Sequence, residues 1–214
     1  MSYAIALFRT AIKTKIRADL AVPVVSDLDD ASITQWGDEH VHTVMHMLHQ
    51  AMLDLGQEAD LADVFEELTV YDTAVTFTSG SAVKTSGMFS VINFVVNSDS
   101  ITSRKARIVS LKEFRGMDSR NFVLTPDVEH PIVTLAGNAI KVSPTTITAG
   151  KVDYIKDHPT IANGVLLNAQ GFSALVYLVI AEYYDFIGQL GRAPEYRALA
   201  KEVLYGDTRK QIKI

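Results

Sequence analysis

The sequence contains no cysteine, and this absence removes two kinds of site. Without thiols the chain has neither disulfide bonds nor a thiolate zinc centre. It also lacks the roughly 20 consecutive apolar residues of a membrane-spanning helix, because Glu182 and Asp185 interrupt its most apolar stretch. The first residues mix Arg and Lys among apolar side chains, unlike a secretory signal peptide. We therefore expect a globular protein without a membrane partner.

Motifs for phosphate binding and nucleophilic catalysis are missing as well. The glycines form neither GxxxxGK[ST] nor GxGxxG, and no serine lies in a GxSxG motif. The carboxylate pair Asp29 and Asp30 precedes a predicted helix, where negative charge is favourable without any catalytic role. Aromatic residues do not alternate with basic ones as in a base-stacking surface. We expect no enzyme, no catalytic residue and no cofactor.

The composition is that of one globular domain. Of the 214 residues, 48% are hydrophobic and 21% are charged, which is ordinary for a folded protein. No repeat or long linker divides the sequence, so we predict a single domain over residues 1–214. The net charge of −5 disfavours tight wrapping of nucleic acid, because phosphate contacts need clustered Lys and Arg.

The most apolar segment, residues 168–205, predicts two helices that meet at a corner made by Gly188 and Gly191. In the first helix apolar side chains cover most of the circumference, which indicates burial on several sides, in a core or between subunits. We expect Gly206 to end the second helix and residues 207–214 to form a tail. The apolar residues of the first helix are Phe172, Leu175, Val176, Val179, Ile180, Tyr183, Tyr184 and Ile187.

Two further helices are predicted in residues 1–68. The first covers residues 3–18, where apolar side chains repeat on one face. In the second, Ser32 and Gln35 match the capping-box pattern, which predicts that the helix begins there. Its apolar residues continue at helical spacing to about Leu55.

Three histidines of this second helix share one face, at positions i, i+4 and i+7, and two such side chains could bind a transition metal. They are His42, His46 and His49. No HExxH pattern accompanies them and no third ligand follows from the spacing. We therefore assign no metal ligand and interpret the face as polar or inter-subunit. A metal-dependent hydrolase is the remote alternative, and zinc retained after dialysis but lost in His46→Ala would favour it.

From residue 69 the helical periodicity gives way to short runs rich in β-branched and aromatic residues, separated by turn sequences. Residues 69–156 are predicted to be mainly β, as an antiparallel sheet or small sandwich. The expected strands are 70–77, 88–96, 106–109, 131–135, 139–142 and 147–156, with a helical turn at 111–115.

Together these elements predict an α+β fold, in which a bundle of two N-terminal and two C-terminal helices carries a small β insertion in the middle. This order resembles head-to-tail connector proteins, also called adaptors or neck-ring proteins, of tailed bacteriophages. The residues that carry the resemblance are Val152–Pro159 (VDYIKDHP), Leu175–Leu178 (LVYL), Ala181–Tyr184 (AEYY), Ile187–Gly188 and Glu195–Tyr196.

The resemblance spans roughly residues 32–205 and implies a structural protein of the virion neck, present in the host cytoplasm before assembly. Such adaptors form rings, typically dodecameric, between the portal protein and the tail. They extend the channel through which double-stranded DNA passes without sequence-specific binding, and they dock the next neck or tail protein. A mildly negative net charge suits such a channel wall. Another virion component, such as a tail terminator, is the main alternative.

Two interaction sites follow as expectations. A ring would explain a helix that is apolar on more sides than a two-layer monomer needs, which implies a subunit interface at Phe172, Val176, Val179, Tyr183, Tyr184 and Ile187. The tail is either free, which is the default, or an arm that adds a strand to a neighbouring ring. The residues of this possible arm are Arg209, Lys210, Ile212, Lys213 and Ile214.

Overall fold

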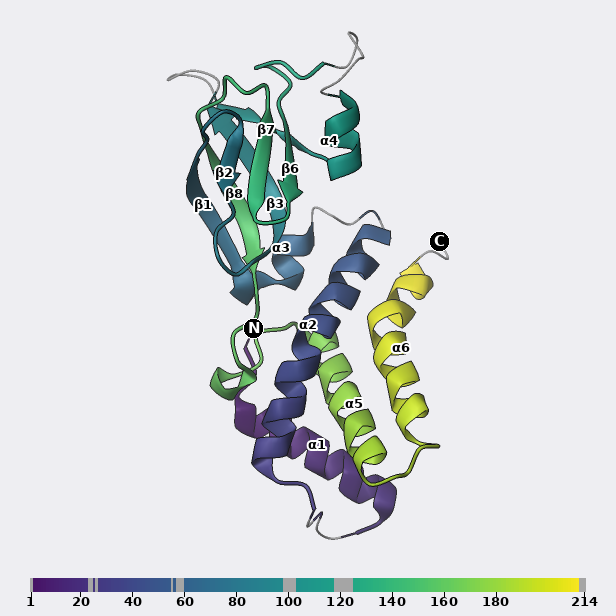
Figure 1. Ribbon diagram of the computed structural model, residues 1–214. Coiled ribbons are helices and arrows are strands. Elements are labelled where there is room, and N and C mark those ends of the chain that lie inside the picture. The colour runs from purple at the N-terminus through teal and green to yellow at the C-terminus, as the bar shows by residue number, and fades with distance from the viewer. Residues whose placement is uncertain are drawn as a thin grey trace. The chain divides into compact units, whose positions relative to one another are not determined.

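The computed structural model confirms the predicted α+β fold, with helices at both ends of the chain and strands in the middle (Figure 1). The chain forms two compact units: a helical unit, Met1–Leu68 with His158–Ile214, and a β unit, Thr69–Asp157. The sequence predicted one domain with a β insertion, and the structure divides the chain where that insertion begins and ends. The structure describes residues 2–22, 25, 27–54, 56, 60–97, 103–117 and 125–211.

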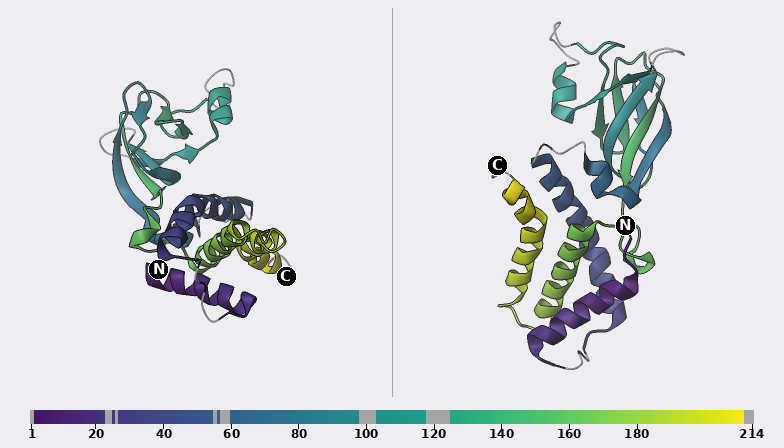
Figure 2. Two further views of the ribbon diagram at one scale, coloured as in Figure 1. Left: turned by 60° about the horizontal axis from the view of Figure 1, so that its bottom comes forward. Right: turned by 180° about the vertical axis from the view of Figure 1, so that it is seen from behind.

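Four long helices of the described residues build the helical unit. They are α1 (Ile5–Leu20), α2 (Asp30–Asp54), α5 (Ala169–Phe186) and α6 (Ala193–Gln211). Helix α5 packs against each of the other three; α2, α5 and α6 lie side by side while α1 crosses their ends (Figures 1 and 2). A short helix α3 (Leu61–Val64) and a 3-10 turn η2 (Glu66–Leu68) end the N-terminal half. In the described part of the chain, no helix has the length and apolar character needed to cross a bilayer.

Helix α2 begins at Asp30 rather than at Ser32, because a different residue caps it. The carboxylate of Asp29 accepts the backbone N–H of Ser32 at 2.6 Å, and this hydrogen bond holds the pKa of Asp29 below its ordinary value. Gln35, which the capping box assigned to the helix start, instead donates to Glu39 one turn further along at 2.9 Å. The predicted helix is confirmed, and the predicted cap is wrong.

Helix α6 also differs from the expectation at its end. Gly206 does not end it, and the helix continues to Gln211. A glycine inside a helix costs only about 1 kcal/mol relative to alanine, which is too little to end a helix by itself. The predicted tail is therefore helical over residues 207–211, and residues 212–214 lie outside the described residues.

The β unit consists of two four-stranded sheets whose strand pairs are antiparallel except for β5 with β6. Of the two predicted forms, a single antiparallel sheet or a small sandwich, the inserted β structure has the second. The first sheet has the order β1 (Thr69–Thr76), β8 (Ala149–Lys156), β3 (Met88–Asn97) and β4 (Ser103–Lys105). The second has the order β2 (Ser81–Val83), β7 (Ala139–Ser143), β6 (Ile132–Ala136) and β5 (Arg107–Ile108).

The chain passes between the two sheets four times, after β1, β2, β4 and β7, and the passages after β1 and β4 involve short strands that the sequence did not reveal. Strand β1 leads through a turn at Gly80, whose φ of 74° is the left-handed conformation that glycine adopts readily, into β2 of the second sheet. Strand β4 leads into β5 through buried Ala106, whose N–H donates to Phe94 at 2.8 Å. The sequence analysis did not predict β2 or β4, because a strand of three residues is too short to show an alternating pattern of apolar and polar side chains.

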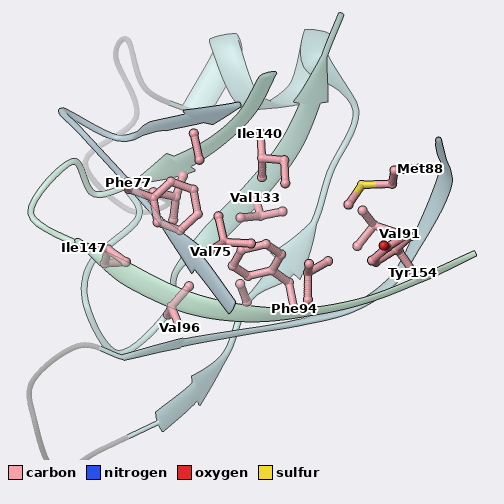
Figure 3. Packing of buried hydrophobic residues seen from close by; sticks show 14 residues of the cluster. Val75, Phe77, Met88, Val91, Phe94, Val96, Val133, Ile140, Ile147 and Tyr154 are labelled. Carbon is pink, nitrogen blue, oxygen red and sulfur yellow. The ribbon is translucent and has the colours of Figure 1, made fainter. Parts of the chain in front are cut away.

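The interior of the β unit is formed by side chains from both sheets. Figure 3 shows Phe94 from β3 in the same interior as Val133 from β6 and Ile140 from β7, and all three are fully buried. The rings of Phe77 and Phe94 lie 5.7 Å apart. Phe94 and Val96 of β3 and Val152 and Tyr154 of β8 face this core at alternate positions, whereas two register shifts earlier in β3 place Met88 and Val91 in the same core.

Helix α4 (Leu111–Met117) covers part of the outer face of the second sheet. Its buried Phe114 packs with Val109 and with Ile132 of β6. The sequence predicted one helical turn here, and the structure confirms it with an extension to Met117.

In the helical unit, the segment that follows β8 is bound to α2 at Gly37 and Asp38. The Asp38 carboxylate accepts the N–H of Ile161 at 2.7 Å and the hydroxyl of Thr160 at 3.0 Å. The fully buried side chain of Ile161 occupies the space that a side chain at position 37 would need. The close approach between α2 and this segment therefore requires glycine.

We expect Gly37→Ala to destabilise the helical unit. An added Cβ would lie 2.1 Å from Cδ1 of Ile161 and 3.2 Å from the buried ring of Phe8, and overpacking of this kind costs about 1–3 kcal/mol. The measurement is urea unfolding followed by far-UV circular dichroism. Ile161→Val removes the colliding atom, so the double variant should lose much less relative to Ile161→Val alone. Additive losses would show that the collision is not the cause.

Candidate interaction surface

The structure places the predicted interface helix α5 in the centre of the helical unit. Its neighbours α1, α2 and α6 surround it. Phe172 and Ile187 are half-buried, and the Phe172 ring contacts the rings of Tyr3 and Phe8 at centroid distances of 4.2 and 5.8 Å. Packing within the chain thus accounts for the apolar circumference of α5. The other four predicted interface residues are at most 8% exposed: Val176, Val179, Tyr183 and Tyr184.

A polar network closes the corner between α5 and α6. The carboxylate of Asp19, near the end of α1, accepts the hydroxyls of Tyr184 (3.3 Å) and Tyr196. Arg192 donates to the Asp19 carbonyl at 3.2 Å and to the Tyr184 hydroxyl at 3.3 Å. Its guanidinium lies 5.5 Å from the Tyr184 ring centre, within cation–π range. Burial raises the pKa of Tyr184, so its phenol stays protonated and donates.

This corner carries exposed apolar side chains on a fixed support. Phe186 is 66% exposed and Leu190 is 69% exposed. The Phe186 ring lies 5.8 Å from the ring of Trp36 on α2. Phe186 ends α5 and Leu190 lies in the short connection to α6, and exposed apolar groups close together mark contact surfaces more than scattered ones do. We call Trp36, Phe186 and Leu190 the apolar corner. The sequence analysis did not find this surface, because helical periodicity predicts which apolar residues are buried and not which ones stay exposed.

The histidines of α2 have different surroundings. His40 contacts Glu182 of α5 at 3.3 Å, which links the two helices. His42 and His46 are exposed, and His49 is half-buried. Among the residues that the structure describes, no three His, Asp or Glu side chains are grouped so that they could hold a metal ion.

A further histidine, His158, is built into the fold at the start of the segment that follows β8. Its side chain is 5% exposed. Nε2 accepts the N–H of Leu166 at 2.8 Å, and Nδ1 is in short contact with the carbonyl of Pro159. These partners assign the neutral tautomer with the proton on Nδ1. Nothing in the sequence around His158 indicates its burial.

The pKa of His158 is lowered, chiefly because burial disfavours the charged ring. The charge of His42 acts in the same direction, and the Pro159 carbonyl and Asp38 oppose it. A proton on Nε2 would also remove the acceptor of the Leu166 N–H. The neutral form of His158 therefore keeps the hydrogen bond from the Leu166 N–H and holds the segment between β8 and α5 in place.

The structure describes only part of the predicted partner-binding arm at the end of the chain. Arg209 and Lys210 lie on the α6 helix, whereas Ile212, Lys213 and Ile214 lie outside the described residues. Binding of a partner by these residues stays a prediction.

No protein-family model matches the sequence, and no curated protein matches it at a significant level. Functional inference therefore rests on the residues and their arrangement.

We expect acid to destabilise the helical unit through His158. Because its pKa in the folded chain lies below the unfolded value of about 6.5, the unfolded state takes up the proton first. The free energy of unfolding should therefore fall as the pH drops below about 6.5. Urea unfolding at a series of pH values measures this slope.

His158→Gln keeps an acceptor for the Leu166 N–H but does not titrate, so the acid slope should flatten. The matched control is His130→Gln in the β unit, where the side chain is 85% exposed and pairs with Asp127 of the same unit; its loss should leave the acid slope of the helical unit in place. An equal slope in His158→Gln and the wild type would exclude His158 as its source.

Proposed function

We propose that this chain is a head-to-tail adaptor that assembles as a ring between the portal and the tail of a tailed bacteriophage. The observation that supports it most is the order of elements. Helices from both ends of the chain build one unit, and a β unit is inserted between Leu68 and His158. This is the order on which the resemblance to adaptors depends.

The segments that carry the resemblance also have structural roles. VDYIKDHP covers the end of β8 and buried His158, and AEYY includes Tyr184 of the polar network. Tyr196 in α6 belongs to the same network. The residues that carry the resemblance thus include side chains that hold the helical unit together as well as the end of β8 in the β unit.

A cyclic ring requires two different surfaces on each subunit, because the contact between neighbours is heterologous. With most of the predicted α5 residues buried inside their own subunit, a neighbouring subunit needs exposed apolar groups elsewhere. The apolar corner supplies such groups on a support fixed by the Asp19 network. We assign it as one side of the subunit contact.

We expect the combined variant Phe186→Asp and Leu190→Asp to remain folded but to lose ring assembly. Both side chains are mostly exposed, so charge costs little in the monomer and much in a closed apolar contact. Native mass spectrometry with negative-stain imaging, with and without portal protein, measures the assembly. The control is Val83→Asp in the β unit, where the side chain is 77% exposed.

Each result has a defined meaning. Wild-type rings, alone or only on the portal, that disappear in the double variant support the proposal and its interface. Rings in both proteins would keep the adaptor and reject the apolar corner. Binding to a tail tube but not to a portal would favour a tail terminator. A monomer at all concentrations that ignores both partners would reject a neck protein, and retained zinc would then favour the hydrolase.

A further inference from the structure

A polar hollow of about 370 Å³ lies on the outer face of the first sheet of the β unit. Asn93 and Asp153 are paired across β3 and β8, and their neighbours Phe94 and Val152 face the core. The hollow is lined by six polar residues and one apolar one: Asp72, Asn93, Asn97, Ser103, Lys151 and Asp153, with Val95.

Asp153 organises one side of this hollow. One carboxylate oxygen accepts the backbone N–H of Asp72 at 2.8 Å, and the other accepts the amide of Asn93 at 3.0 Å. Lys151 in turn donates to the Asp72 carboxylate at 3.1 Å. These bonds connect three neighbouring strands and fix the side chains before any ligand arrives.

The backbone at Asp72 departs from a regular strand in a way that alters this face. The register of β1 shifts between Val70 and Thr73, and Asp72 has a φ of 54°, which is uncommon for a residue other than glycine. A β-bulge re-aims the side chain that it carries. The bulge and its bond to Asp153 together bring a carboxylate to the edge of the hollow.

Some polar atoms of the hollow are not used by the protein. Oδ1 of Asn93 is buried and has no hydrogen-bond partner among the described residues. Buried polar atoms are normally paired, so the hydrogen bonding of Asn93 is incomplete within the described residues, but its buried Oδ1 is out of reach of a ligand in the hollow. On the other side, Oδ1 of Asn97 accepts the Ser103 hydroxyl at 3.2 Å, which leaves the Asn97 amide group as a donor within the described structure.

The charged and polar side chains that line the hollow restrict the class of ligand that it can bind. A divalent cation such as Ca²⁺ takes six to eight oxygen ligands, but Lys151 already neutralises Asp72 and both oxygens of Asp153 accept hydrogen bonds. An anion would meet two carboxylates, and an apolar ligand would find only Val95. Hydroxyl groups satisfy this surface, because each one donates and accepts a hydrogen bond.

We propose that this hollow binds a neutral, hydroxyl-rich ligand, namely a saccharide. Adjacent hydroxyls donate to the Asp72 carboxylate and accept from the Lys151 ammonium and the Asn97 amide. The same chemistry serves a free sugar and a sugar unit of a longer glycan. This inference does not depend on the proposed assembly into a ring.

The test is NMR of the full-length, isotopically labelled protein titrated with glucose, galactose and N-acetylglucosamine at millimolar concentrations, and with soluble oligosaccharides of each. We expect saturable amide shifts confined to Asp72, Asn93, Asn97 and the facing residues of β8. Binding of both forms indicates a site for one sugar unit. Binding of oligosaccharides alone indicates an extended glycan as the source.

Variants that keep the fold test the assigned donors. Lys151→Met and Asn97→Ala each remove one donor from an outward position, and each should weaken binding about three- to tenfold. Lys141→Met is the matched control, because Lys141 is exposed on β7 of the other sheet and should leave the affinity unchanged. Dispersed amide spectra show that each variant is folded.

The proposal is overturned by an absence of shifts with every sugar, by shifts spread over the surface, or by equal affinities in all variants. A parallel titration with CaCl₂ covers the competing chemistry. Saturable shifts at the hollow with Ca²⁺ and none with any sugar would replace the saccharide site by a cation site.

Discussion

The helical unit depends on the burial of α5. This helix packs against α1 and α2 from the N-terminal part of the chain and against α6 from the C-terminal end, so it joins segments that the β unit separates in sequence. Full burial of one large aliphatic side chain contributes about 1.5–3 kcal/mol, and most of the α5 circumference is buried. The Asp19 network also fixes the relative orientation of the helices. The Asp19 carboxylate can accept the hydroxyls of Tyr184 and Tyr196 only when α1, α5 and α6 meet at one corner.

Burial of α5 also explains how the fold accommodates an insertion between Leu68 and His158. The segment that follows the insertion is attached within the helical unit by bonds that need nothing from the strands. Asp38 binds the backbone of Ile161, His158 binds Leu166, and Tyr3 pairs with Val165 through two hydrogen bonds of 2.9 and 2.8 Å. The start of α5 is therefore fixed by contacts of its own unit, with Asn168 as its cap.

The elements with strong periodicity were predictable from sequence, and the contacts between distant residues were not. The apolar circumference of α5 predicts burial, but it does not distinguish a neighbouring helix from a neighbouring subunit. Asp29 and Ser32 both suit a helix cap, and only the structure shows which carboxylate or hydroxyl is used. The Asp19 network joins residues up to 177 positions apart, and the bulge at Asp72 leaves no mark in composition. The hollow and the apolar corner were therefore beyond sequence reasoning.

The difference between buried and exposed apolar residues also determines which variants can reveal an assembly. A charge at Val179 would remove a fully buried side chain from the core, so loss of rings would follow from unfolding whether or not α5 contacts a neighbour. Phe186 and Leu190 lie on the corner that the Asp19 network already supports, and their exposed surface is not needed by the monomer. Loss of assembly there, with the folded monomer intact and with Val83→Asp still assembling, points to a contact that those side chains make outside their own subunit.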